Sequence, residues 1–214
     1  MSQAASRRIE MLVCAGTACV AGGAFKIREA LEKELEKRDL RKEVTVEITG
    51  CNGFCGHGPL MVVQPEGIFY GLIKPEDVPF LVEEHFIKGK PVERLMFHHP
   101  EQKAPIPLLA DIPFFKKQMP IVLQHRGVIN PEKIEHYTER NGYSALRKAL
   151  TGMKPEEVIE EIIASGLRGR GGAGFPTGLK WKICRAEKKT PRYIIGNCDE
   201  GDPGAYMDRS VFES

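Results

Sequence analysis

The chain has 214 residues, enough for one large domain or two modest ones, and we expect two. Its 31 Lys and Arg residues nearly balance its 29 Asp and Glu residues, and a net charge of +2 gives no field that indicates a nucleic-acid or membrane-surface partner. No apolar run approaches the ~20 residues of a membrane span, and residues 1–10 lack the apolar core of a signal peptide, so we expect a cytoplasmic protein without a membrane span.

The first 90 residues alternate between strand and helix patterns. Residues 9–13 predict a short buried strand, and 22–38 repeat apolar side chains at the three-and-four spacing of one helical face. Residues 44–48 alternate apolar and polar side chains, as in a strand with one buried face. Two further strands form a predicted hairpin, and Pro75 begins a second helix that Gly89 ends. The order β-α-β-β-β-α matches a thioredoxin-like layout.

Prolines then cluster over residues 90–120, which we expect to be a stiff, extended linker. Beyond it, three short helices are predicted at 131–140, 143–150 and 155–165. The run 193–196 is of strand type, and nothing after it closes a domain, so we expect this sequence to be part of a longer protein. The predicted division is a first domain over 7–89, a linker over 90–120 and the start of an incomplete second domain over 121–214.

Four of the six cysteines lie in the loops that follow the first two predicted strands. Cys14 and Cys19 are spaced C-x4-C, and Cys51 and Cys55 are spaced C-x3-C. Because parallel strands of a β-α-β unit end at the same sheet edge, the four thiolates should converge there. Soft sulfur ligands select zinc or an iron–sulfur cluster, and structural zinc usually takes C-x2-C pairs. The wider spacing favours a [2Fe-2S] cluster over zinc or four unrelated buried cysteines.

The residues around these cysteines support that interpretation. Glycines in both loops would let backbone N–H groups approach the sulfurs and tune their potential: Gly16, Gly50, Gly53, Gly56 and Gly58. We interpret His57 as a solvent-side loop residue, because four cysteines complete the site. Cys184 and Cys198 are interpreted as ordinary small apolar side chains. Over residues 9–88, the motifs Cys14-Ala-Gly-Thr-Ala-Cys19 and Cys51-Asn-Gly-Phe-Cys55 resemble those of the thioredoxin-like [2Fe-2S] ferredoxins.

A second candidate site is the glycine-rich segment 166–178. Gly169, Gly171 and Gly174 match G-x-G-x-x-G, but a predicted helix rather than a strand precedes them, which disfavours a Rossmann site. Glycines this dense still permit close backbone approach to a flat ring or a phosphate. A flexible linker is the alternative, although linkers rarely hold aromatic residues such as Phe175. Three side chains add positive charge for a phosphate: Arg168, Arg170 and Lys180.

Two long motifs closely resemble the NADH-oxidising flavoprotein subunit of respiratory complex I, of NAD(P)-linked and electron-bifurcating hydrogenases and of NAD-linked formate dehydrogenases. They are residues 169–181 (Gly-Arg-Gly-Gly-Ala-Gly-Phe-Pro-Thr-Gly-Leu-Lys-Trp) and 197–204 (Asn-Cys-Asp-Glu-Gly-Asp-Pro-Gly). With the helical region before them, the resemblance covers about residues 115–214. The two resemblances imply an α/β protein in which a thioredoxin-like [2Fe-2S] domain precedes the N-terminal part of an α/β FMN- and NADH-binding domain.

The flavoprotein resemblance also implies a set of cofactor-binding residues. The glycine loop, Lys180 and the second motif would contact FMN, and Phe175 would stack against the adenine of NADH. Asp202 stands at the third acidic position, where the family usually has Glu, and Ile183 stands where complex I members tend to have a second aromatic. The implied set is Gly169, Arg170, Gly171, Gly172, Ala173, Gly174, Phe175, Lys180, Asn197, Asp199, Glu200 and Asp202.

The function implied is that of an electron-transfer oxidoreductase subunit of the NADH dehydrogenase, or diaphorase, type. It would pass electrons between NAD(P)H, FMN and iron–sulfur clusters in a multi-subunit hydrogenase, formate dehydrogenase or complex I-like assembly, with a [4Fe-4S] cluster expected beyond residue 214. The cofactors carry this chemistry, so no catalytic side chain is expected. One alternative is a non-catalytic [2Fe-2S] module that docks and conducts electrons, and another is a zinc-stabilised assembly subunit.

Overall fold

The computed structural model describes residues 9–202 and 204–212 of the chain. It divides into two compact units, one of Met1–His136 with Cys198–Ser214 and one of Tyr137–Asn197. Within the described residues, none of the helices is long and apolar enough to cross a membrane. The domain bounds given above remain a prediction, and the expectation for the N-terminal eight residues lies outside the described part of the chain.

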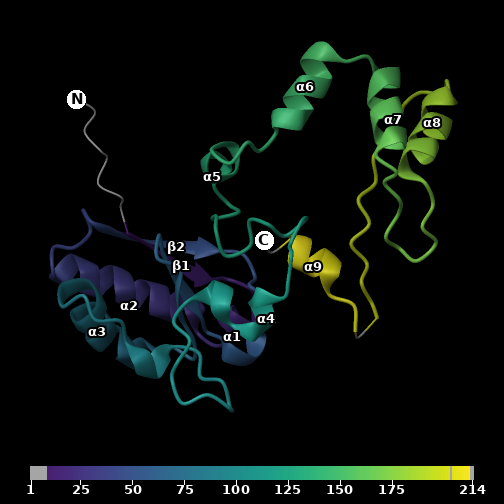
Figure 1. The fold of residues 1–214 in the computed structure, drawn as a ribbon. Helices are drawn as coiled ribbons and strands as arrows, with labels where there is room; N and C mark the ends of the chain where they lie inside the picture. The colour runs from purple at the N-terminus through teal and green to yellow at the C-terminus, as the bar shows by residue number, and fades with distance from the viewer. Residues whose placement is uncertain (1–8, 203, 213–214) are drawn as a thin grey trace. The chain divides into compact units, whose positions relative to one another are not determined.

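A four-stranded sheet forms the centre of the first unit (Figure 1). Its strands are β1 (Ile9–Cys14), β2 (Val44–Thr49), β3 (Met61–Gln64) and β4 (Ile68–Tyr70). They lie in the order β2-β1-β3-β4, with β1 parallel to β2 and with β3 antiparallel to both β1 and β4. The predicted succession of strands, with one crossover and one hairpin, is confirmed.

The crossover between the parallel strands holds two helices where the sequence predicted one. α1 (Thr17–Ala21) and α2 (Ala24–Lys37) are separated by two glycines, and Gly23 adopts a φ of +99°, which glycine tolerates best. α2 buries the face that the apolar spacing predicted, and each large apolar side chain there contributes about 1.5–3 kcal/mol to stability. The buried apolar residues of this face are Ala24, Ile27, Leu31 and Leu35.

The second predicted helix is irregular. A 3-10 turn (Pro75–Asp77) leads into α3 (Val78–Leu81), and the chain continues as a π-helical turn (Val82–Ile87). Pro79 has no N–H to donate to the carbonyl four residues earlier, so a regular first turn cannot form. The apolar side chains at helical spacing in this segment nevertheless lie in the core: Val78, Leu81 and Val82.

The segment expected to be a linker, residues 90–120, instead packs against the sheet. Val92, Leu95 and Ile112 are buried in the same core as the strands, and short helical turns include α4 (Pro113–Lys116). Backbone bonds join the segment to the hairpin, since Phe69 donates to the carbonyl of Pro107 at 2.8 Å. Proline clustering predicted stiffness, but the apolar residues between the prolines give this stretch a surface to bury.

Tyr70 connects that segment to the core. Its hydroxyl accepts a hydrogen bond from the N–H of Val92 at 3.1 Å and lies 2.9 Å from Nδ1 of His85. Burial raises the pKa of Tyr70 to about 12. Because an unfolded tyrosine titrates near pH 10, the unfolded state loses its proton first, and the free energy of unfolding should fall as the pH rises from about 10 towards 12.

The substitution Tyr70→Phe is expected to remove most of that alkaline fall, as measured by urea unfolding at a series of pH values. At neutral pH it should cost about 1–3 kcal/mol, because the buried N–H of Val92 and the partly buried ring of His85 lose their partner. Tyr193→Phe is the matched control, since its side chain belongs to a residue that is 79% exposed. If the free energy of unfolding of Tyr70→Phe depends on pH as that of the wild type does, the alkaline fall does not come from Tyr70.

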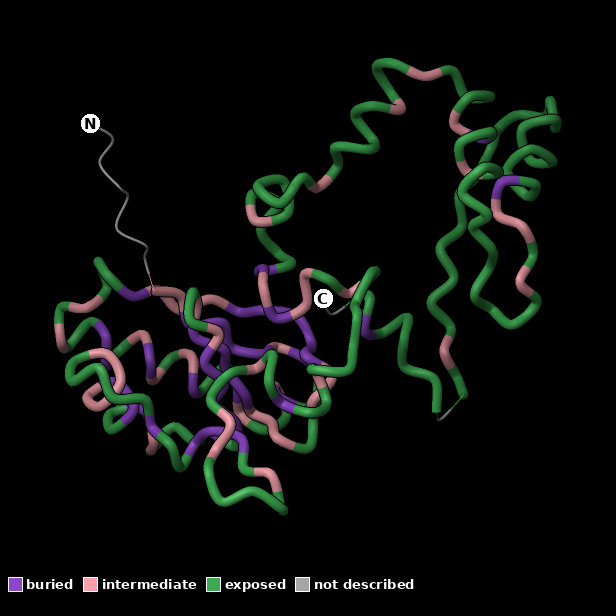
Figure 2. Tube along the Cα trace, viewed as in Figure 1, coloured by how far each residue is buried: buried purple, intermediate pink, exposed green. Residues whose placement is uncertain are grey.

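The second unit is built from short helices, and Figure 2 shows that few of its residues are buried. α6 (Ser144–Gly152) and α7 (Pro155–Ala164) occupy the two stretches predicted to be helical, and α8 (Thr177–Ala186) follows the glycine-rich loop. α7 and α8 pack closely at Gly178, where an added Cβ would lie 2.5 Å from the side chain of Ile163. The first predicted helix, over 131–140, is the shorter α5 (Ile134–Thr138).

The strand predicted at 193–196 is absent from the described structure. These residues are irregular, and Ile194 and Ile195 are 102% and 87% exposed. A strand is stable only beside a neighbouring strand and over a core, and no described segment pairs with this one. The chain then forms α9 (Met207–Phe212).

Candidate functional site

The four cysteines of the first unit lie at one end of its sheet. Cys14 is the last residue of β1, Cys19 lies in α1, Cys51 follows β2 by two residues, and Cys55 begins a short 3-10 turn. The two loops emerge from the same end because β1 and β2 are parallel, and Ala15 donates a backbone hydrogen bond across them to Thr49 at 2.9 Å. The predicted convergence of the two pairs is therefore what the fold produces.

The sulfurs of these cysteines interact with one another. A hydrogen bond between Cys14 and Cys19 raises the pKa of the Cys14 thiol and lowers that of Cys19. Cys51 also bonds to Cys14, and Cys19 is close enough to feel the charges of Cys51 and Cys55. Cys55 is exposed and the other three are buried. Among the described residues, no group of three or more His, Cys, Asp or Glu side chains is arranged to hold a single metal ion.

Two glycines make room for these sulfurs. A Cβ added at Gly16 would lie 2.8 Å from Sγ of Cys51, and one added at Gly58 would lie 2.7 Å from Sγ of Cys19. Real Cβ atoms do not approach sulfur this closely, so larger residues would displace the thiols. Four neighbouring thiolates in a glycine-lined cradle fit an iron–sulfur cluster, which is held by four cysteine sulfurs.

Backbone N–H groups also point at the sulfurs. Gly53 donates to Sγ of Cys51 at 3.4 Å, the N–H of Asn52 lowers the pKa of Cys14, and that of Leu60 lowers the pKa of Cys19. Such donors stabilise negative charge on thiolates and tune the reduction potential of iron–sulfur sites. The glycines predicted to permit this approach include Gly53, whereas Leu60 gave no sign in the sequence.

His57 is half-buried rather than on the solvent side of its loop. Its ring stacks on Phe54 with centroids 4.2 Å apart, and burial lowers the pKa of His57. Nδ1 of His57 is buried without a hydrogen-bond partner among the described residues. Phe54 is also stacked with Phe114 of α4, with centroids 5.0 Å apart. Aromatic packing therefore braces the loop that carries Cys55.

Residues 113–133, which we term the covering segment, lie against the cysteine loops. Thr49 donates its hydroxyl to the carbonyl of Ile129 at 2.7 Å. Nδ2 of Asn130 donates to Glu47 at 2.9 Å, and Lys133 pairs with the same carboxylate. Burial alone would raise the pKa of Glu47, but these two partners bring it below its ordinary value. The covering segment is thus attached along β2 as far as the cysteine end.

The glycine-rich loop of the second unit is closed by backbone hydrogen bonds. Gly169 donates to the carbonyl of Phe175 at 2.9 Å, and Thr177 donates to that of Leu167 at 3.0 Å. Arg168 folds over the loop and donates through Nε to the carbonyl of Gly174 at 2.6 Å. α7 precedes the loop, which confirms the helix predicted there in place of the strand that a Rossmann site has. Open space surrounds the Cβ positions of its central glycines, Gly171 and Gly172.

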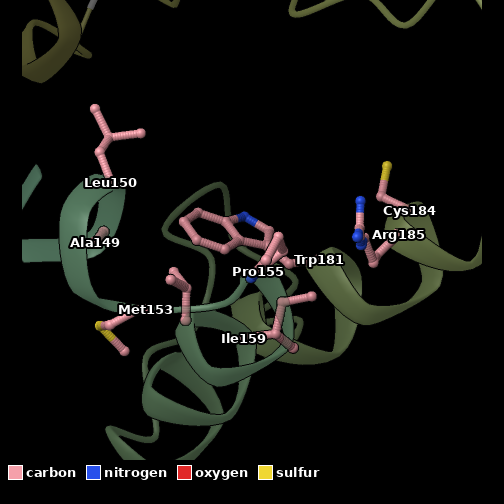
Figure 3. Close-up of a pocket in the computed structure, with 9 residues that line it drawn as sticks. Ala149, Leu150, Met153, Pro155, Ile159, Trp181, Cys184 and Arg185 are labelled. Atoms are coloured by element: carbon pink, nitrogen blue, oxygen red, sulfur yellow. The ribbon is translucent and has the colours of Figure 1, made fainter.

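Three residues singled out in the sequence line one hollow beside this loop. Phe175, Lys180 and Ile183 border a space of about 400 Å³. A separate apolar hollow of about 620 Å³ lies between α6, α7 and α8, and Figure 3 shows the ring of Trp181 in it. None of the implied cofactor-binding residues lines that second space. Cys184, expected to be an ordinary apolar side chain, is exposed and borders both hollows.

The acidic motif lies partly in the other unit, and the structure gives Glu200 a local role. Its carboxylate accepts backbone hydrogen bonds from Asp208 at 2.8 Å and Arg209 at 3.1 Å, at the start of α9. These bonds hold the pKa of Glu200 below its ordinary value. Asp202 and the exposed Cys198 border the same hollow as Glu200, of about 540 Å³. Asn197 and Asp199 are exposed.

Comparison with known proteins identifies several relatives. The NADP-reducing hydrogenase subunit HndC of Solidesulfovibrio fructosivorans is 51% identical over 98 residues, 46% of this chain and 20% of the relative. A subunit of the NADH-quinone oxidoreductase of Escherichia coli K12 is 43% identical over 95 residues, 44% of this chain and 21% of the relative. The alpha subunit of the NAD-reducing hydrogenase HoxS of Cupriavidus necator is 29% identical over 208 residues, 95% of this chain and 32% of the relative.

This chain therefore spans between a fifth and a third of the length of those relatives. Two family models also match it. The model of the thioredoxin-like [2Fe-2S] ferredoxin matches residues 2–85, which hold the four neighbouring cysteines. The model of the Nuo51 FMN-binding domain matches residues 162–214, which hold the glycine-rich loop and the acidic motif. The first part of the chain is thus similar to the thioredoxin-like [2Fe-2S] ferredoxins and its last part to the Nuo51 FMN-binding domain.

Proposed function

We propose that this chain is part of an NADH dehydrogenase-type flavoprotein subunit that transfers electrons between NAD(P)H, FMN and iron–sulfur clusters. The observation that carries the proposal is the cradle of four neighbouring cysteines, joined in one chain to a flavoprotein motif. When bound, FMN exchanges hydride with a nicotinamide and the [2Fe-2S] cluster carries single electrons. The protein supplies binding, orientation and electrostatics.

Each proposed site has a defined set of residues. Cys14, Cys19, Cys51 and Cys55 would hold the [2Fe-2S] cluster. The second set would bind the flavin and nucleotide, with Phe175 and Lys180 already beside one hollow. That set is Gly169, Arg170, Gly171, Gly172, Ala173, Gly174, Phe175, Lys180, Asn197, Asp199, Glu200 and Asp202. A ligand of Glu200 would have to share its carboxylate with the backbone of α9 or displace those bonds.

The relatives also indicate where the protein would work and with which partner subunits. We propose a cytoplasmic protein that works with other subunits of a hydrogenase, formate dehydrogenase or complex I-like assembly, with a [4Fe-4S] cluster in a part of the protein beyond residue 214. Names of the relatives support this setting, since they describe hydrogenase and NADH-quinone oxidoreductase subunits. The competing proposal is a non-catalytic [2Fe-2S] module, which the cysteine site alone would also support.

Flavin content and NADH-dependent reduction distinguish these two functions. A preparation that contains the complete FMN-binding domain should hold one FMN and reduce an artificial acceptor with NADH. Lys180→Ala should release flavin, because it removes the positive charge beside the loop, whereas Lys189→Ala, outside the hollow, should not. A complete domain that keeps its cluster but binds no flavin and does not oxidise NADH would support the non-catalytic module.

Asp202 is expected to influence the choice of nucleotide in the same preparation. A carboxylate beside the nucleotide can accept hydrogen bonds from ribose hydroxyls and repels the additional phosphate of NADPH. Asp202→Asn should therefore improve kcat/KM with NADPH more than it lowers kcat/KM with NADH. Steady-state assays with both nucleotides measure the ratio, and Asp208→Asn serves as the control. If the ratio of kcat/KM with NADPH to kcat/KM with NADH is unchanged in Asp202→Asn, the Asp202 carboxylate does not influence the choice of nucleotide.

A further inference from the structure

The guanidinium of Arg126 lies against the loop between Cys51 and Cys55. A Cβ added at Gly53, in the middle of this loop, would lie 2.9 Å from Nη1 of Arg126. The N–H of Gly53 donates to Sγ of Cys51 at 3.4 Å. Arg126 therefore touches the backbone unit that bonds a proposed ligand sulfur. Gly53 has a φ of +71°, so glycine serves both the turn and the close approach of the arginine.

The charge of Arg126 is not neutralised by a carboxylate. Nη2 donates to Oε1 of Gln118 at 3.5 Å, which is a neutral partner. The ion pairs found within residues 9–202 and 204–212 do not include Arg126. The residue is half-buried, so water and salt screen its charge less than that of an exposed arginine. A positive field is therefore directed at the cysteine loop.

Contacts on both sides keep Arg126 in this place. The neighbouring Gly127 has a φ of +72°, and a Cβ there would lie 2.3 Å from Oδ1 of the buried Asn52. On the C-terminal side of Arg126, the carbonyl of Ile129 accepts a hydrogen bond from Thr49, and on its N-terminal side, Phe114 stacks on Phe54. The covering segment thus fixes the arginine from a part of the chain more than seventy residues beyond the cysteine loop.

We propose that Arg126 is a positioning residue that raises the reduction potential of the cluster held by the four cysteines. This proposal rests on the proposed function, because it requires the cluster. Reduction of the bound cluster would add one electron, supplied by a reduced flavin, and would convert one ferric ion to ferrous without gain of a proton. The added negative charge is stabilised by a nearby positive charge, so Arg126 favours the reduced form. A residue that lies between the two matched regions of the sequence, 2–85 and 162–214, would in this way make the ferredoxin domain a better electron acceptor.

The test compares Arg126→Gln and Arg126→Lys with the wild-type 214-residue chain in a potentiometric titration followed by visible absorption. At a fixed applied potential, Arg126→Gln should lower the ratio of reduced to oxidised cluster about three- to tenfold, where tenfold corresponds to 59 mV for one electron. Arg126→Lys keeps the charge and should recover most of the difference. Raising the ionic strength should narrow the gap between wild type and Arg126→Gln.

Arg41→Gln is the matched control. Arg41 precedes β2, and the six residues of that strand separate Arg41 from the cysteine end by about 20 Å. The side chain of Arg41 pairs with Glu36. This variant should titrate as wild type does. Equal potentials for wild type and Arg126→Gln at equal iron content would overturn the role of Arg126 and leave the proposed function intact. A wild-type chain without a [2Fe-2S] spectrum would overturn the proposed function itself.

If Arg126→Gln loses iron, the Arg126→Lys variant shows whether the positive charge sets the reduction potential. If the charge acts as proposed, Arg126→Lys restores iron content and potential together. If Arg126→Lys restores the iron content but leaves the potential as low as in Arg126→Gln, the positive charge does not set the potential, and the proposal is wrong.

Discussion

Replacing Cys51 by serine is expected to remove most of the iron from the chain and to abolish or sharply alter its visible iron–sulfur absorption. The Cys51 side chain is 3% exposed, bonds to Cys14 and receives the N–H of Gly53, so no solvent or neighbouring sulfur can take its place. A serine oxygen is a harder ligand than a cysteine sulfur, and the serine hydroxyl loses its proton less readily than a thiol does. Because a group bound only by the folded state stabilises that state, the melting temperature of the variant should fall as well.

The other three proposed ligands should respond in the same way when changed to serine: Cys14, Cys19 and Cys55. The remaining cysteines provide internal controls, because Cys184 and Cys198 are exposed and belong to neither of the two cysteine pairs. Their serine variants should keep the full spectrum. Full iron content and an unchanged spectrum in Cys51→Ser would show that the cluster is held by other residues.

Adding a single methyl group at Gly16 is expected to have an effect of similar size. Gly16 has φ −62° and ψ 152°, a conformation that alanine adopts without strain. Its Cβ, however, would lie 2.8 Å from both Cβ and Sγ of Cys51. Gly16→Ala must therefore push Cys51 away from the other thiols, and iron content and absorption should drop together.

Gly56→Ala is the control for Gly16→Ala. Gly56 lies in the second cysteine loop, directly after Cys55, and nothing approaches its Cβ position within 4 Å. The Gly56→Ala chain should keep wild-type iron content and absorption. If both alanine variants behave alike, the closeness of Gly16 to the sulfur has no bearing on cluster binding.

The cysteine site was predictable because its determinants are local. Cys14 ends one strand of clear pattern and Cys51 follows another, and the parallel pairing of those strands brings the two cysteine loops together. The helix before the glycine-rich loop was visible for the same reason. Helical spacing along α2 also identified the correct buried face.

Longer-range packing was not predictable. Prolines over residues 90–120 indicated a linker, because composition alone does not show that Val92 and Ile112 find a place in the core. Arg126 gave no signal, since its partner Gly53 lies far back in the chain. Glu200 likewise gave no sign that its carboxylate would bond to the backbone of α9, which begins only a few residues later.

The most direct measurement of the central claim is the content of iron, acid-labile sulfide and zinc in the purified 214-residue chain, together with its visible spectrum. We expect two irons and two sulfides for each chain, negligible zinc and the absorption of a [2Fe-2S] cluster, and we expect Cys51→Ser to lose the iron, the sulfide and this absorption. One zinc for each chain, no iron and no visible absorption would contradict it.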